Sequence, residues 1–162
     1  MNAIFDPVFV EFATRLFIAL SLGMLIGVER EMAGKGAGMR TYALVSMGSA
    51  LFVAVSVMAV EQFGGSAVVD PLRIPAQIVS GIGFLGAGLI IFKERLEGLT
   101  TAAGLWVAAG IGMAAGFGFT ALAVISTVFT IFVFTALWFI SSKVKTAYNH
   151  DASHEDHYHR MD

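Results

Sequence analysis

Polar side chains descend into one of the long apolar stretches of this chain, where they could contact an ion or a polar ligand. Asp70, Arg73 and Gln77 are spaced three and four residues apart, so a helix places them on one face. Ionisable groups inside a membrane span often mark a ligand contact. In the plainer interpretation, Asp70 caps the helix and Gln77 bonds to a neighbouring helix. Both interpretations stay open, and this stripe is the strongest candidate site.

A second polar pair lies in the first apolar stretch. Glu11 and Arg15 are four residues apart and can form an ion pair on one helical face. Either both residues sit in the outer headgroup layer, or they face the bundle and contact an ion or substrate.

A third group gathers charged residues between the first two apolar stretches. Gly34, Gly36 and Gly38 predict an ordered loop there, with Thr41 as the cap of the next helix. Thr100 or Thr101 is the expected cap of a later helix, within reach of the same charges. This loop is either solvated or part of a charge network at the cytoplasmic mouth. The predicted network contains Glu29, Arg30, Glu31, Lys35, Arg40, Thr41, Thr100 and Thr101.

The composition places these groups in a membrane protein. Of 162 residues, 57% are hydrophobic and 14% are charged, whereas soluble domains average about 45–50% and 25%. A net charge of −2 without basic runs predicts no nucleic-acid partner. The absence of cysteine excludes disulfides and thiolate metal sites. No nucleophile with a base is apparent in the spans, so we do not expect an enzyme.

Five apolar stretches must position the polar groups, which predicts an all-α fold with five transmembrane helices. Their ranges are residues 8–28, 41–60, 74–92, 99–117 and 119–140. Lysine and arginine gather on one side, which should be cytoplasmic, so the N-terminus is expected outside and the C-terminus inside. The basic residues behind this orientation are Arg30, Lys35, Arg40, Lys93, Arg95, Lys143 and Lys145.

Glycines along the spans predict close helix packing, because each one weakens a helix by about 1 kcal/mol unless packing compensates. The predicted packing positions are Gly23, Gly27, Gly81, Gly83, Gly86, Gly88, Gly112 and Gly116. Residues 81–86 match G-x-G-x-x-G, but apolar flanks without a βαβ unit favour packing over a dinucleotide site. The span 99–117 is rich in Gly and Ala and should be buried, whereas 119–140 is bulky and should face lipid. Exposed small-residue surfaces also predict a homo-oligomer.

The chain is expected to divide into a transmembrane domain, residues 1–145, and a polar tail, residues 146–162. His150, His154, His157 and His159 lie in the tail beside acidic residues. The tail is either disordered or binds a divalent metal.

Three strings in order resemble the MgtC/SapB family of bacterial inner-membrane proteins. They are LGMLIGVERE with AGMRT (22–31 and 37–41), RIPAQIVSGIGFLGAG (73–88) and GLTTAAGLW (98–106). The similarity is to the short, SapB-like form without a C-terminal ACT-like domain. Positions that match the family motifs are Arg15, Glu29, Arg30, Arg40, Thr41, Asp70, Arg73, Gln77, Thr100 and Thr101.

The resemblance implies a multi-pass protein of the bacterial plasma membrane that is linked to magnesium homeostasis. Two functions are compatible with it. The protein could bind or move a small ion such as Mg²⁺ or a proton, with Mg²⁺ as a ligand rather than a resident cofactor. Alternatively, it could be a non-transporting regulator that binds another membrane complex, such as the F-type ATP synthase.

Overall fold

The computed structural model describes residues 7–63, 70, 72–92 and 96–137. It contains α1 (Pro7–Met32), α2 (Met39–Phe63), α3 (Arg73–Leu89) and α4 (Leu99–Gly116), followed by a further helix, Thr120–Leu137. The strands β1 (Ile91–Phe92) and β2 (Leu96–Glu97) form a two-residue antiparallel hairpin between α3 and α4. Several predictions lie outside the described residues, namely those on Lys93, Arg95, Lys143, Lys145 and the tail 146–162.

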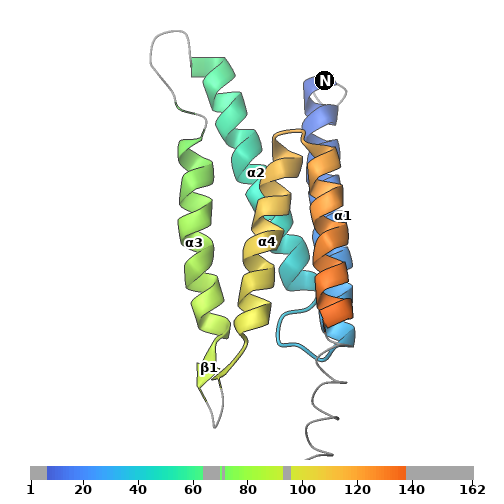
Figure 1. Cartoon of the computed structure of the whole chain (residues 1–162). Coiled ribbons are helices and arrows are strands. Elements are labelled where there is room, and N and C mark those ends of the chain that lie inside the picture. Colours follow the sequence, from blue (N-terminus) through green and yellow to red (C-terminus); the bar gives the residue numbers. More distant parts are fainter. Residues whose placement is uncertain (1–6, 64–69, 71, 93–95, 138–162) are drawn as a thin grey trace, which may run out of the picture. The chain divides into compact units, whose positions relative to one another are not determined.

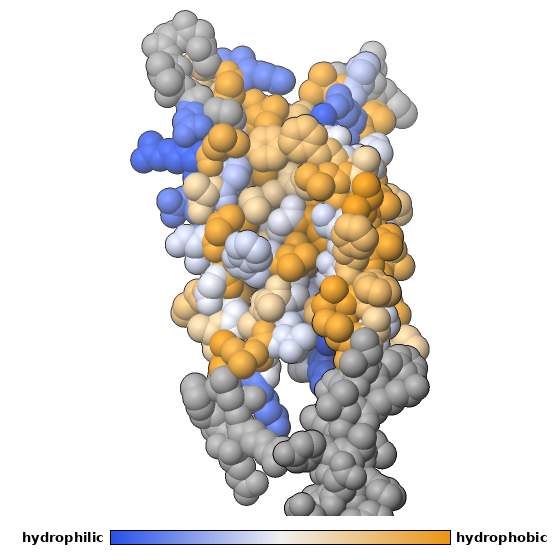
Figure 2. Space-filling view, viewed as in Figure 1, coloured by the Kyte–Doolittle hydropathy of each residue, from blue (hydrophilic) through white to orange (hydrophobic). Residues whose placement is uncertain are grey.

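Successive helices run in alternating directions from α1 to the helix after α4 (Figure 1). The loop at residues 33–38 therefore lies at the same end as the β1–β2 hairpin. Hydrophobic side chains cover much of the middle of these helices, and hydrophilic ones gather toward the two ends (Figure 2). This surface matches that of a helical membrane protein.

Four helices are long and apolar enough to cross a membrane: α1, α2, α4 and Thr120–Leu137. The described structure is thus helical, as predicted, apart from the short hairpin. At 17 residues, α3 is about 25 Å long. The predicted span 74–92 is wrong at its end, because the helix stops at Leu89 and residues 91–92 pair with β2. Five crossings and their orientation stay predictions.

Small residues bring α1, α2 and α4 into backbone contact. A Cβ atom added at Gly23 of α1 would lie 2.5 Å from the carbonyl oxygen of Tyr42 in α2. The same addition at Gly112 of α4 would lie 2.0 Å from the carbonyl oxygen of Ser46. Gly27 and Gly116 have comparable contacts, at 2.5 Å from Met39 and 2.9 Å from Ala50. Close packing at these four glycines agrees with the prediction, as does the burial of α4.

The glycines of α3 are not in close contact with another backbone. A Cβ at Gly86 would lie 3.5 Å from Ala102 of α4, which is an ordinary contact. Added at Gly81, Gly83 or Gly88, it would meet nothing within 4 Å. The expected close approach at these three glycines is therefore wrong among the described residues. The buried positions of α3 are Pro75, Ile82 and Gly86, which face α4, whereas the other three glycines lie off that face.

The helix Thr120–Leu137 satisfies its hydroxyl groups internally. Thr127, Thr130 and Thr135 each donate a hydrogen bond to the backbone carbonyl four residues earlier, at 2.6–2.9 Å. Such bonds let an apolar helix carry hydroxyl groups without a partner on another helix.

Candidate functional site

A buried ion pair ends α1. The guanidinium of Arg30 is only 3% exposed and donates through Nε and Nη2 to the carboxylate of Glu29, with 2.5 Å between Nη2 and Oε1. A cation in the last turn also interacts favourably with the negative end of the helix dipole. We call this region, with the loop 33–38, the Arg30 end.

The neighbouring Glu31, still in α1, binds the first residue of α2. Its carboxylate accepts a hydrogen bond from the backbone N–H of Met39 at 3.1 Å, and the side chain lies against Gly38. Because α2 begins at Met39, the prediction that Thr41 caps it is wrong: a carboxylate from α1 binds the first N–H group instead. Thr41 lies in the first turn of α2, and its side chain is exposed.

Lys35 and Arg40, also predicted in this network, are exposed and lie outside the Glu29–Arg30 pair. The predicted network is thus only partly assembled in the described structure.

Tyr42 connects α2 to α4 at the same end. Its buried hydroxyl donates to the backbone carbonyl of Thr101 at 3.2 Å. Sequence reasoning missed this residue. A signal was available, because Tyr42 is a lone hydroxyl-bearing aromatic in the first turn of an apolar helix. In membranes such a hydroxyl needs a partner.

The expected threonine cap of α4 is wrong. Gly98 occupies the N-cap position with a positive φ of 91° and no side-chain hydrogen bond. A Cβ at Gly98 would lie 2.1 Å from the carbonyl oxygen of Leu89, so only glycine fits there. Thr101 is buried one turn into the helix, and Thr100 is exposed.

Arg15 organises the opposite end, which we call the Arg15 end. Its guanidinium forms the predicted ion pair with Glu11 and donates from Nη1 to the backbone carbonyl of Gly116 at 3.0 Å. It also lies 5.2 Å from the centre of the Phe12 ring and contacts the Cα side of Gly118. Arg15 therefore faces the bundle and joins α1 to the turn after α4, whereas Glu11 is exposed.

The stripe of Asp70, Arg73 and Gln77 does not join Arg15. All three side chains are exposed, and the ion pairs within the described ranges are Glu11–Arg15 and Glu29–Arg30. Asp70 accepts a hydrogen bond from the N–H of Leu72 at 2.9 Å, one residue before α3. The N-cap itself is Leu72, without a side-chain bond, so the predicted role of Asp70 as N-cap is wrong by two residues.

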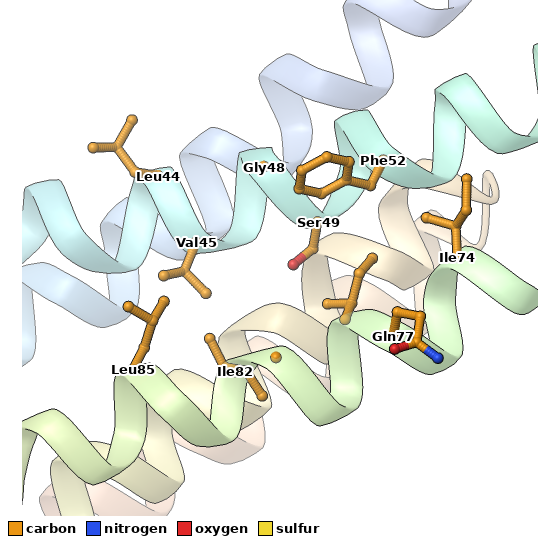
Figure 3. A pocket seen from close by; sticks show the side chains of 11 residues that line it. Leu44, Val45, Gly48, Ser49, Phe52, Ile74, Gln77, Ile82 and Leu85 are labelled. Atoms are coloured by element: carbon orange, nitrogen blue, oxygen red, sulfur yellow. The ribbon is translucent and has the colours of Figure 1, made fainter.

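A groove separates α2 from α3 (Figure 3). Its volume is about 540 Å³ and its walls are almost wholly apolar. The polar members are Ser49 on α2 and Gln77 on α3. The apolar or glycine members are Leu44, Val45, Gly48, Phe52, Ile74, Ile78, Gly81, Ile82 and Leu85.

A comparison with protein-family models assigns the chain to a family. Residues 16–143 match the model of the MgtC family. The chain belongs to the MgtC family. Together with its apolar helices, this membership makes it a multi-pass membrane protein.

Curated relatives support the assignment. The chain is 39% identical to protein SrpB of Synechococcus elongatus over 142 residues, which cover 81% of this chain and 78% of that protein. It is 48% identical over 100 residues to an Escherichia coli K12 protein named "Putative magnesium transporter YhiD", covering 57% and 45%. It is 49% identical over 117 residues to protein MgtC of Brucella abortus, covering 71% and 46%.

The chain is also 43% identical to protein SapB of Bacillus subtilis over 93 residues, which cover 55% of this chain and 40% of that protein. The chain thus spans about half the length of several of these relatives, including 45% of YhiD. No solved structure matches the chain. Within the described residues, no cluster of three or more His, Asp or Glu side chains could hold a metal ion.

Proposed function

We propose that this chain is a bacterial plasma-membrane protein of magnesium homeostasis that acts by binding another membrane component rather than by carrying the ion. The link to magnesium rests on family membership and on the relative whose name refers to a magnesium transporter. The candidate partner supplied by the family resemblance is the F-type ATP synthase.

The observation that favours binding over ion transport is that every carboxylate of α1 already has a partner within the protein. Its three acidic residues are Glu11, Glu29 and Glu31. Glu11 is paired with Arg15, Glu29 is paired with Arg30, and Glu31 binds the Met39 N–H. Mg²⁺ prefers carboxylate oxygens and retains several of its waters. An ion would have to displace an arginine or break the start of α2 to use these groups, so they serve the fold.

Flux and growth measurements together test this function. Purified protein in liposomes loaded with a Mg²⁺-sensitive dye should produce no more Mg²⁺ entry than empty liposomes, under a concentration gradient or a membrane potential. A deletion strain grown in limiting Mg²⁺ should nevertheless regain growth when the chain is expressed. Protein-dependent Mg²⁺ flux would contradict the binding role, and unrestored growth would contradict the link to magnesium.

A second candidate function is movement of Mg²⁺ or a proton. The magnesium-transporter name of one relative favours it, as does the placement of ionisable side chains at both ends of α1. The same liposomes discriminate the two, with a pH-sensitive dye added for protons. If ions move, Glu29→Gln should abolish their movement, because it removes a carboxylate inside the bundle.

A further inference from the structure

The outer face of α3 carries a coiled-coil seam. Ile74, Gly81 and Gly88 repeat every seven residues, and Gln77 and Phe84 repeat at the alternating positions between them. This is the a/d spacing of a helix–helix seam, here with small or polar residues at three of the five positions. All five positions are exposed, and Phe84 is 83% exposed. The buried face of α3 is a different one, formed by Pro75, Ile82 and Gly86.

The α2–α3 groove opens beside this seam. Ile74, Gln77 and Gly81 belong both to the seam and to the groove wall. Gly48 of α2 faces the same groove, and a Cβ at Gly48 or Gly81 would meet nothing within 4 Å. Two helices thus provide open glycines where another backbone can approach closely.

The hydroxyl group of Ser49 is one of the few polar groups in the groove wall. Ser49 is 5% exposed and lines the groove together with Gln77. Figure 3 shows its side chain extending from α2 on the side of α3. A hydroxyl group in an apolar wall favours an occupant that brings a polar side chain to that depth.

We propose that the occupant is a second copy of this chain, whose α3 packs in parallel against the first α3 along this seam. Parallel packing follows because all copies insert into the membrane in the same orientation. In such packing a residue at a d position enters a hole formed by the partner's a, d and e positions. For Phe84 this hole is bounded by the second copy's Gly81, Phe84, Leu85 and Gly88. Two glycines there leave room for a phenyl ring.

Polar and charged groups complement each other across the same two-fold axis. The Gln77 amides, which carry both donors and acceptors, can pair with each other or reach Ser49. At the beginning of α3, Asp70 and Arg73 are exposed and form no ion pair within the described ranges. Parallel packing of α3 brings the Asp70 and Arg73 side chains of both copies to the same end of the seam, so each copy presents an acid and a base to the other. This proposal does not depend on the role in magnesium homeostasis.

Disulfide crosslinking in native membranes tests the seam. The chain contains no cysteine, so Gln77→Cys and Phe84→Cys each introduce one thiol into the full chain. Both variants should give a covalent dimer as the main product on mild oxidation. Phe129→Cys, at a position that is 65% exposed on another helix, should stay mostly monomeric. No dimer at 77 and 84, or equal yields at 129, would overturn the proposal.

Affinity measurements in lipid vesicles test the chemistry of the interface. With fluorescently labelled full chain, Gly81→Leu should weaken self-association at least tenfold in a dilution experiment. Gly110→Leu is the matched control, because Gly110 is also open but lies on α4. Asp70→Arg and Arg73→Asp should each weaken association, and the double variant should restore it. The proposal would also be overturned if the purified wild-type chain is monomeric. This holds equally if a phospholipid or a different polypeptide is found bound to the monomer.

Discussion

Arg30 is a buried charged residue that forms an ion pair with Glu29. A buried ion pair adds little net stability, but loss of one member leaves the other charge unpaired in a low-dielectric interior. We expect Arg30→Gln to lower the free energy of unfolding by about 3–5 kcal/mol. Thermal unfolding in mild detergent measures the change. Lys35→Gln, at an exposed loop position, is the control and should melt like the wild type.

The double variant Glu29→Gln/Arg30→Gln sharpens this test. Removal of both charges should recover part of the stability lost in Arg30→Gln, because no unpaired charge remains. A double variant less stable than Arg30→Gln would contradict the pair as the source of the effect.

Removal of the Tyr42 hydroxyl at the same end should destabilise the protein less than Arg30→Gln does. Tyr42→Phe removes only the hydroxyl that donates to the Thr101 carbonyl, so unfolding should become easier by about 0.5–1.5 kcal/mol. Tyr42→Ala should be much more destabilising, because it also leaves a cavity where a fully buried ring was. Equal melting temperatures of Tyr42→Phe and the wild type would mean that this hydrogen bond contributes nothing.

At the scale of elements, the contacts between α2 and α4 depend on the absence of side chains. Gly112 lies so close to Ser46 that a Cβ would come within 2.0 Å of its carbonyl oxygen. We expect Gly112→Leu to destabilise the protein by about 1–3 kcal/mol or more, because the backbones must separate. Gly110→Leu, on the same helix with open space around it, should remain folded. Similar expression and melting of both variants would contradict the packing of α4 against α2.

The sequence predicted which helices exist far better than it predicted their partners. Apolar length located the helices, and the abundance of Gly and Ala in α4 correctly predicted its burial. The same reasoning failed for Gly81 and Gly83, because composition does not reveal which face of α3 has a neighbour. The predicted threonine caps of α2 and α4 were wrong for a related reason. A distant carboxylate, Glu31, and a positive-φ glycine, Gly98, fill those places, and neither follows from local sequence preference.

At the scale of the whole molecule, the predicted orientation can be checked in intact cells. Single cysteines at Gly36, Glu61 and Glu97 probe the connections between helices. The predicted topology places Gly36→Cys and Glu97→Cys on the cytoplasmic side, where a membrane-impermeant thiol reagent cannot reach them. Glu61→Cys should react from outside. Labelling of positions 36 and 97 on different sides would exclude the alternating crossings.

The hydrogen bond from Arg15 to the carbonyl of Gly116 spans 101 residues of sequence. At a synthesis rate of about 5–20 residues per second, the arginine precedes its acceptor by roughly 5–20 s. During that time the first helix resides in the bilayer with only Glu11 to balance its charge. Nascent chains that end before residue 116 therefore lack one of the hydrogen-bond acceptors that Arg15 uses in the folded protein.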